Sequence, residues 1–265
     1  MLTDITLGQY YPGDSLLHRL DPRTKLVCTL LLITGIFLAE HYLAYLAVVT
    51  FSILVVALSK VPPTLYLRSL RPLWLIIIFT IGIHILTTPG TLLYKLGPVA
   101  ITQEGFSRGF LLSVRLVLLI VISSALTFTT SPIALTDGIE RLLSPLQRIG
   151  VPAHELAMMM TIALRFIPTL LEETDRIIKA QTARGADFSS GGILKRAKSL
   201  VPVLVPLFIS AFRRADELAV AMEARCYRGG QNRTRMKALR FGAADTASFA
   251  AVVCLLLILL WQRWW

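Results

Sequence analysis

Five long apolar runs constrain this chain more than any other feature of its sequence. They are residues 26–39, 42–58, 72–88, 109–130 and 247–261. Each approaches the roughly 20 residues that a helix needs to cross a bilayer. Of the 265 residues, 55% are hydrophobic and only 16% are charged, whereas about 25% are charged in ordinary soluble domains. We therefore expect an all-α polytopic membrane protein with about five transmembrane helices.

The basic residues around these runs indicate an orientation. They gather before the first run and after the second, at Arg19, Arg23, Lys25, Lys60, Arg68 and Arg71. Only Lys95 lies between the third run and Arg108. Because cytoplasmic loops carry the excess of Lys and Arg, the N-terminus, the second loop and the region after the fourth run are predicted to be cytoplasmic. An odd number of spans then places the C-terminus outside, with Trp261, Trp264 and Trp265 as interfacial anchors.

Residues 131–246 differ from the apolar runs on either side. This stretch holds 17 of the 27 Lys and Arg residues and 11 of the 16 Asp and Glu residues. We therefore divide the chain into three regions. Residues 1–130 are a transmembrane region of four helices, residues 131–246 are a cytoplasmic or membrane-surface domain, and residues 247–265 are a final transmembrane helix.

Two long amphipathic helices are predicted within residues 131–246. Apolar residues recur every three or four positions from Leu156 to Ile178 and again from Leu194 to Met222, with charged residues between them. The first helix should span about 30 residues, or roughly 45 Å. A shorter helix, residues 135–149, is expected before both. Residues 201–212 are apolar but only about 12 residues long, so we expect them to lie along the membrane surface or against the other long helix.

Prolines and glycines predict how these helices bend and end. Pro152 stands at the start of the first helix, and Gly185 is suited to a left-handed stop at its end. Gly229-Gly230 is expected to end the unit that contains the second helix. Kinks are predicted at three internal prolines: Pro168, Pro202 and Pro206.

The ends of the two long helices repeat one pattern. Residues 175–185 and 216–226 both read Asp-x4-Ala-x2-Ala-Arg followed by a small residue, and the two copies are 41 residues apart. The arginines could simply offset the helix dipole and bond the free carbonyls of the last turn. The repetition favours a second interpretation, in which each tip enters a groove on a partner and its guanidinium binds carboxylates or carbonyls there. The candidate tips are Ala183, Arg184, Gly185, Ala224, Arg225 and Cys226.

Motifs for catalysis and cofactor binding are missing from the sequence. It contains no P-loop run GxxxxGK[ST], no GxGxxG, no HExxH and no GxSxG. The cysteines form no CxxC pair, which leaves neither a disulfide framework nor a zinc site. We expect no cofactor, no metal and no catalytic residues in this chain.

Few polar side chains are predicted at membrane depth. The apolar runs hold no Asp or Glu, although such residues usually carry ions and protons in secondary transporters. His84 is interpreted as a packed or interfacial residue, and Arg115 either reaches toward the outer boundary or has a functional role. His154-Glu155 resembles a catalytic pair, but a Glu in a first helical turn is favourable for the helix dipole alone. The basic residues between Arg225 and Arg240 are interpreted as a flank attracted to anionic lipid rather than to nucleic acid.

With these residues in view, the chain resembles the transmembrane T component of energy-coupling factor (ECF) vitamin transporters over nearly its whole length. The segments that carry the resemblance are residues 8–15 (GQYYPGDS), 17–25 (LHRLDPRTK), 129–132 (TTSP), 163–170 (ALRFIPTL), 180–188 (AQTARGADF) and 222–230 (MEARCYRGG). The N-terminal segments are most similar to members of the shared-module type, which serve several vitamin-binding subunits.

The resemblance implies a non-catalytic scaffold in a bacterial or archaeal cell membrane. Its partners would be two ABC-type ATPases, expected as a heterodimer, and a small substrate-binding membrane protein, the S component. ATP and Mg would be bound by the ATPases. By the same resemblance, the tips around Arg184 and Arg225 would insert into grooves on the two ATPases; Cys226 departs from the Gly that usually ends the pattern. A secondary transporter with a cytoplasmic regulatory insert is the alternative, and a membrane-bound enzyme is a third, weaker one.

Overall fold

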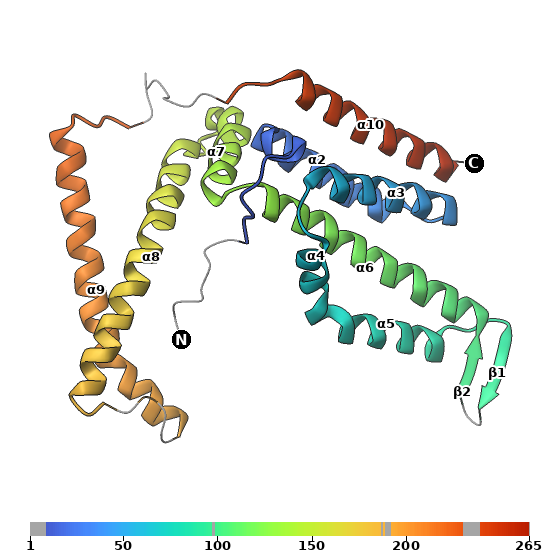
Figure 1. Cartoon of the computed structure of the whole chain (residues 1–265), viewed down its shortest axis with the longest axis horizontal. Helices are drawn as coiled ribbons and strands as arrows, with labels where there is room; N and C mark the ends of the chain where they lie inside the picture. The colour runs from blue at the N-terminus through green and yellow to red at the C-terminus, as the bar shows by residue number, and fades with distance from the viewer. Residues whose placement is uncertain (1–8, 97–98, 187, 189–191, 230–238, 265) are drawn as a thin grey trace. The chain divides into compact units, whose positions relative to one another are not determined.

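The chain forms helices and one short β-hairpin, arranged in two compact units. The computed structural model describes residues 9–96, 99–186, 188, 192–229 and 239–264. The unit that we call the membrane unit spans residues 8–138 and 238–265, and the long-helix unit spans residues 139–237. Figure 1 traces the helices of both units in chain order. The predicted all-α membrane fold is confirmed.

The membrane unit contains most of the elements. In chain order they are α1 (Leu16–Arg19), α2 (Pro22–Leu38), α3 (Tyr42–Ser59), α4 (Pro63–Leu70), the 3-10 helix η1 (Arg71–Leu73), α5 (Trp74–Thr87), β1 (Leu92–Leu96), β2 (Val99–Thr102), α6 (Gln103–Thr129) and α10 (Ala243–Trp264). The helix α7 (Pro132–Leu143) begins in this unit and ends in the other.

Five helical segments of the described chain are long and apolar enough to cross a membrane, which agrees with the predicted number. They are Tyr42–Ser59, Pro63–Thr87, Gln103–Thr129, Ala153–Ala183 and Ala243–Gln262. The set differs from the prediction in one pair of helices. The predicted first span falls on α2, which has only 17 residues, while α8 (Ala153–Ala183) qualifies with the lowest hydropathy of the five, 1.2. The sequence predicts an amphipathic helix here, because apolar residues recur every three or four positions with charged residues between them.

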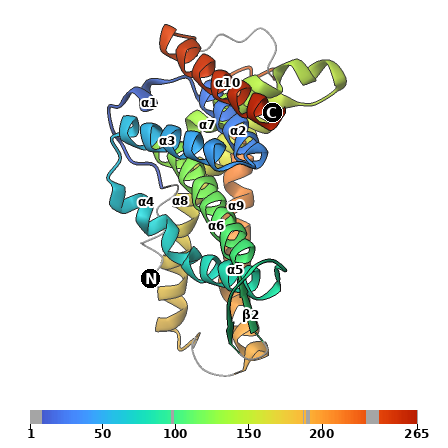
Figure 2. The ribbon, with the colours of Figure 1, turned by 90° about the vertical axis from the view of Figure 1, so that its right-hand side faces the viewer.

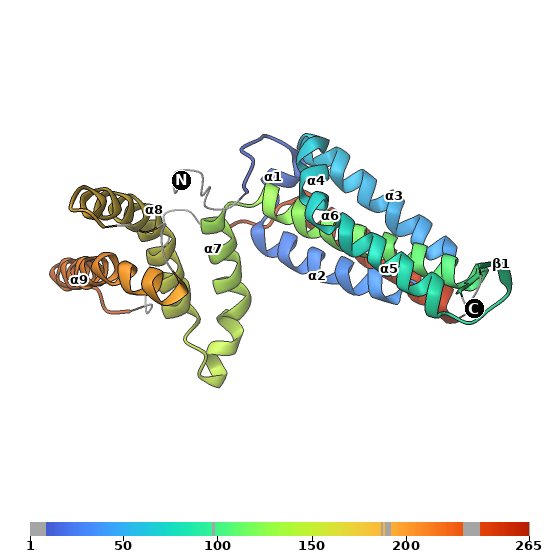
Figure 3. The ribbon, with the colours of Figure 1, turned by 90° about the horizontal axis from the view of Figure 1, so that it is seen from below.

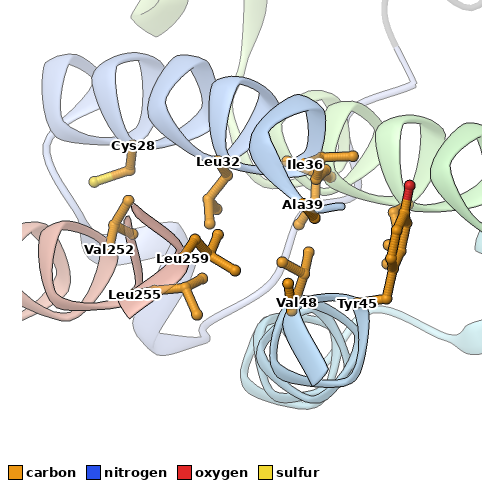
Figure 4. Close-up of a cluster of buried hydrophobic side chains, with 12 residues drawn as sticks. Cys28, Leu32, Ile36, Ala39, Tyr45, Val48, Val252, Leu255 and Leu259 are labelled. Carbon is orange, nitrogen blue, oxygen red and sulfur yellow. The ribbon is translucent and has the colours of Figure 1, made fainter. Parts of the chain in front are cut away.

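A hydrophobic cluster joins α2, α3, α6 and α10 (Figure 4). Ile36 of α2 and Leu259 of α10 are almost fully buried within it. A side chain at Gly35 would come within 2.9 Å of Leu256, so this glycine lets α10 pack closely against α2. Cys28 lies in the same cluster as a small apolar residue, in agreement with the interpretation of the cysteines.

The helices α5 and α6 pack through a row of small residues. Figures 2 and 3 show α5 beside α6, with the hairpin beyond their ends. A Cβ at Gly105 would lie 2.5 Å from the carbonyl oxygen of His84, and one at Gly109 would lie 3.2 Å from the Cα of Ile81. Together with Ser113, these residues form a small-xxx-small-xxx-small pattern, which lets two membrane helices approach backbone to backbone.

The hairpin between α5 and α6 was not predicted from the sequence. Its strands β1 and β2 are antiparallel, with Leu92 paired to Thr102 and Leu96 paired to Val99. Glu104, in the first turn of α6, accepts a hydrogen bond from the backbone N–H of Thr91 at 2.7 Å. The hairpin is thereby fastened to the start of α6.

Hydrogen bonds gather the starts of α2 and α10 and the end of α6 at one end of the membrane unit. Asp245 Oδ1 accepts from the backbone N–H of Asp21 at 2.8 Å. Lys25 Nζ donates to the carbonyl oxygen of Thr129 at 2.8 Å, and the N–H of Tyr11 donates to the carbonyl of Phe128 at 3.0 Å. The N-terminal segment and the last helix therefore meet at the same end of the bundle.

The long-helix unit consists of the end of α7, the 3-10 helix η2 (Ser144–Ile149), α8 and α9 (Ile193–Ala224). The predicted short helix corresponds to α7 and η2 together, and Pro152 caps α8 as expected. Figures 1 and 3 show α8 and α9 next to each other. The helix α9 ends at Ala224, inside the repeated pattern where a helix stop was expected, and the backbone turns left-handed at Cys226.

Candidate docking tips of the two long helices

The helices α8 and α9 end in the same backbone motif, with an arginine at the C-cap of each. At α8, Gly185 N donates to the carbonyl of Thr182 at 2.9 Å and Ala186 N donates to that of Gln181 at 3.0 Å. At α9, Cys226 N donates to Glu223 at 2.9 Å and Tyr227 N donates to Met222 at 3.0 Å. Both sets of bonds are those of a Schellman motif. The repeat seen in the sequence is therefore a repeat in three dimensions.

The residue after each arginine has a positive φ angle. Gly185 has φ +88° and Cys226 has φ +58°. Glycine adopts this conformation without steric cost, whereas a residue with a Cβ is strained there. The left-handed stop predicted at Gly185 is confirmed, and the second tip reaches the same turn with a less suitable residue.

The guanidinium groups of the tips are available for a partner. Arg184 and Arg225 are both exposed. Among the described residues, neither side chain forms a hydrogen bond or an ion pair. The carbonyls of the last turns are instead bonded by backbone N–H groups of the Schellman motifs. Bonding of the last carbonyls therefore does not explain why each helix ends in an arginine.

The two tips lie at opposite ends of an antiparallel helix pair. Gln181, near the end of α8, donates to the carbonyl of Pro202, near the start of α9, at 3.5 Å. At the other end, the Tyr227 hydroxyl lies 3.3 Å from His154 Nε2 at the start of α8. Each tip therefore presents its arginine at a separate place on this unit.

A polar contact joins the two helices midway between the tips. Glu173 Oε1 accepts a hydrogen bond from the Ser210 hydroxyl at 2.6 Å, and Oε2 accepts one from Arg214 at 2.9 Å. These side chains are partly buried. The contact sets the register of α8 against α9, and with it the separation of the tips.

The predicted kink prolines lie inside continuous helices. Pro168 is within α8, and Pro202 and Pro206 are within α9. Figure 1 shows α9 changing direction in its N-terminal part. The role of the three prolines as kinks stays a prediction.

Arg115 and His84, which lie in the apolar runs, both have structural partners. Arg115 donates from Nη2 to the carbonyl of Ala39 at 3.0 Å and lies 5.8 Å from the ring centroids of Phe37 and Tyr45. It thereby bonds the end of α2 and fastens α6 to the α2–α3 turn. His84 Nδ1 lies 3.4 Å from the Thr88 hydroxyl within α5. The interpretation of His84 as a packed residue agrees with this contact.

His154 does not form a pair with Glu155. Its Nδ1 lies 3.0 Å from Glu140 Oε1, and its Nε2 faces Tyr227. Within the described ranges, no group of three or more His, Cys, Asp or Glu side chains could hold a metal ion.

Several residues of the sequence motifs lie outside the described residues. They are Gly8 and Asp187 of the resemblance segments, Gly230 of the Gly229-Gly230 pair, Arg233, Arg235 and Lys237 of the basic flank, and Trp265 of the predicted anchors.

Comparisons with known proteins show the family to which this chain belongs. Residues 13–236 match the family model of CbiQ, described as a cobalt transport protein. A protein of Acidaminococcus fermentans named energy-coupling factor transporter transmembrane protein EcfT is 61% identical over 264 residues, covering 100% of this chain and 98% of that protein. The chain belongs to the EcfT family of energy-coupling factor transporter transmembrane proteins. Relatives of the same name occur in Thermosediminibacter oceani, with 58% identity over 250 residues and 94% of each chain covered, and in Bacillus subtilis, with 47% identity over 264 residues and 99% and 100% covered.

Membership in the EcfT family identifies the chain as a transporter component. As a member of the EcfT family, the chain is a multi-pass transmembrane component of an energy-coupling factor transporter. The recognition made from the sequence segments is confirmed by these matches. Sequence reasoning missed Asp245 and Tyr227, because their bonding partners are distant in the sequence.

Proposed function

We propose that this chain is the scaffold that joins two ABC-type ATPases to a substrate-binding S component and couples ATP hydrolysis to the uptake of a vitamin or other micronutrient. The observation that carries the proposal is the pair of matching tips. Each ends in a Schellman motif, each exposes an arginine, and they lie at opposite ends of the α8–α9 pair. Two separate tips suit two separate partner subunits.

The chemistry of each tip suits insertion into a groove. Ala183 and Ala224 precede the arginines, so the tip is narrow around one long side chain. A guanidinium presents a planar fork of donors that binds a carboxylate or several carbonyls in a fixed geometry. Because Gly185 and Cys226 differ, the two grooves need not be alike, and a heterodimer of ATPases fits this asymmetry.

The coupling would be mechanical. ATP binding closes the ATPase pair and draws the two tips together, and α8 and α9 carry the displacement toward the membrane, where the S component is tipped or released. Pro168, Pro202 and Pro206 would let the long helices bend as they turn between the membrane surface and the ATPases. ATP and Mg belong to the partner ATPases in this account, and the chain itself binds no cofactor and no nucleic acid.

Contacts inside the membrane unit support an orientation for the chain. Arg19, Arg23 and Lys25 lie at the end of the bundle where α2 and α10 begin and α6 ends. The positive-inside rule makes that end cytoplasmic. Residues 131–246 then lie in the cytoplasm or at its membrane surface, in reach of anionic lipid, and the C-terminus lies outside. In this account α8 is a coupling helix rather than a span, because its C-terminal half carries charges at 71–81% exposure, as in the Arg176–Glu172 pair.

The test replaces both arginines together. In the assembled transporter, Arg184→Ala with Arg225→Ala should abolish uptake and remove the ATPases from the purified complex, while membrane insertion is unchanged. The matched control is Arg176→Ala with Arg213→Ala, two exposed arginines of the same helices away from the tips. Full uptake and full ATPase content in the tip variant would sink the proposal.

A further inference from the structure

Three side chains from three elements form a hydrogen-bonded row beside the second tip. Glu140 comes from α7, His154 from the first turn of α8, and Tyr227 from the segment that follows α9. Glu140 Oε1 lies 3.0 Å from His154 Nδ1, and His154 Nε2 lies 3.3 Å from the Tyr227 hydroxyl. The His154 and Glu140 side chains are only 21% and 12% exposed.

A carboxylate only accepts hydrogen bonds, so Nδ1 of His154 donates to Glu140. The Tyr227 hydroxyl can bond Nε2 either as donor or as acceptor. Glu140 thereby orients the ring toward Tyr227. Each of the two outer side chains uses a different nitrogen, so His154 is the link between them.

Tyr227 connects this row to the second tip. It stands two residues after Arg225, and its backbone N–H closes the Schellman motif on the carbonyl of Met222 at 3.0 Å. Its hydroxyl is held by α8 at the same time. The turn at Arg225 and Cys226 is therefore fixed on one side by α9 and on the other by the start of α8.

Among the residues that the structure describes, the first tip has no equivalent of this anchor. The residue that corresponds to Tyr227 is Ala186, which carries no polar side chain. A Cβ built at Gly185 would meet nothing within 4 Å. At the second tip, the turn passes through a residue with a Cβ at positive φ, and such a turn needs surrounding contacts to hold it.

We propose that Glu140, His154 and Tyr227 position the second tip, with His154 and Tyr227 as positioning residues for the docking of one ATPase. The inference rests on the proposed docking function of Arg225. It goes further by making docking at the second tip depend on the α7–α8 corner, while docking at the first tip does not. A displacement of that corner then changes docking of the ATPase at the second tip and not of the ATPase at the first.

The first measurement does not involve the ATPases. Amide hydrogen exchange is followed in the full chain in lipid nanodiscs, at Cys226 and Tyr227 and at Gly185 and Ala186. Tyr227→Phe removes one hydroxyl and keeps the ring, so exchange at the second tip should rise roughly two- to tenfold, the effect of losing one hydrogen bond. Exchange at the first tip should stay unchanged. Equal protection of the second tip in both proteins would overturn the inference.

The second measurement uses the assembled transporter. Tyr227→Phe is combined with Arg225→Ala in one cycle and with Arg184→Ala in another, and ATPase content and uptake are measured. The effects should be non-additive with Arg225→Ala and additive with Arg184→Ala, because only the first pair shares a tip. Additivity in both cycles would overturn the inference.

A rescue variant separates positioning from general stability. Glutamine can place its carbonyl oxygen where His154 Nε2 lies and accept from the Tyr227 hydroxyl, so His154→Gln should retain slow exchange at the second tip, whereas His154→Ala should not. If the Arg184 and Arg225 variants keep their ATPases while Tyr227→Phe still loosens the second tip, the docking function fails and the positioning contact stands.

Discussion

At the scale of single residues, the two tips are alike in their hydrogen bonds and different in one side chain. Gly185 and Cys226 occupy the same place in the two Schellman motifs, with φ angles of +88° and +58°. A residue with a Cβ loses about 1–2 kcal/mol in the left-handed conformation relative to the right-handed one. Family membership does not explain why the second tip carries this strain, but the Tyr227 anchor explains how the turn persists.

Reciprocal substitutions at the tips test the strain. Cys226→Gly should raise the melting temperature of the purified chain in detergent, and Gly185→Ala should lower it. Each change corresponds to about 1 kcal/mol, or roughly 2–4 °C for a chain of this size. Thermal unfolding followed by circular dichroism measures both. A lower melting temperature for Cys226→Gly would contradict the assignment of strain to this residue.

Residue-level prediction from the sequence succeeded where the cause was local. The arginine positions, the cap at Pro152 and the left-handed stop at Gly185 depend on neighbours within one or two turns, and the sequence pattern displays them. Asp245 was missed because its partner, the N–H of Asp21, is 224 positions away. The partners of His154, Glu140 and Tyr227, were not anticipated for the same reason, since both are distant from it in the sequence.

At the scale of elements, α5 and α6 of the membrane unit pack backbone to backbone. Gly105 and Gly109 face the backbone of α5, while none of the residues of α5 is buried. The helix is therefore held on one side by α6 and presents apolar side chains such as Phe79, 65% exposed, on the other. Attachment of α5 depends on the small residues of α6.

Two glycine substitutions give a matched test of this contact. Gly105→Ala should destabilise the chain, because its Cβ would lie 2.5 Å from the His84 carbonyl oxygen. Gly82→Ala, on α5 with nothing within 4 Å, should be neutral or stabilise the helix by up to about 1 kcal/mol. In detergent, Gly105→Ala should therefore have a lower melting temperature than Gly82→Ala. An equal drop in the melting temperature of both variants would contradict the packing of α5 on α6.

The helices themselves were largely predictable from apolar periodicity, and two features were not. The hairpin is short and lies between two apolar runs, and the pairing between β1 and β2 leaves no sign in a helical period. The status of α8 was ambiguous for another reason. Its first half is apolar enough to span and its second half is charged, so length and composition cannot separate a span from an amphipathic helix.

At the scale of the whole molecule, the chain is a membrane unit and a long-helix unit with different tasks. The membrane unit brings the start of α2 and the start of α10 together through Asp21 and Asp245. The long-helix unit carries both tips. In the proposed function the partners of these tips are other chains, so nothing in this sequence could specify their surfaces.

The native cysteines test the orientation. Cys226 is exposed at the second tip and Cys28 is buried. In intact cells that produce the chain without its ATPases, a membrane-impermeant maleimide should leave Cys226 unlabelled, and permeabilisation should allow labelling. Cys226→Ser is the control that separates this signal from Cys254, which lies in α10. Labelling of Cys226 in intact cells would place the tips outside and contradict the topology.

The most direct test of the central claim is photocrosslinking from the tips in the assembled transporter. A photoreactive amino acid replaces Ala183 in one variant, Ala224 in a second and the exposed Phe79 of α5 in a third. We predict that positions 183 and 224 each capture an ATPase subunit, identified by mass spectrometry, and that position 79 captures none. Failure of both tip positions to capture an ATPase, while the complex remains assembled, would contradict the account.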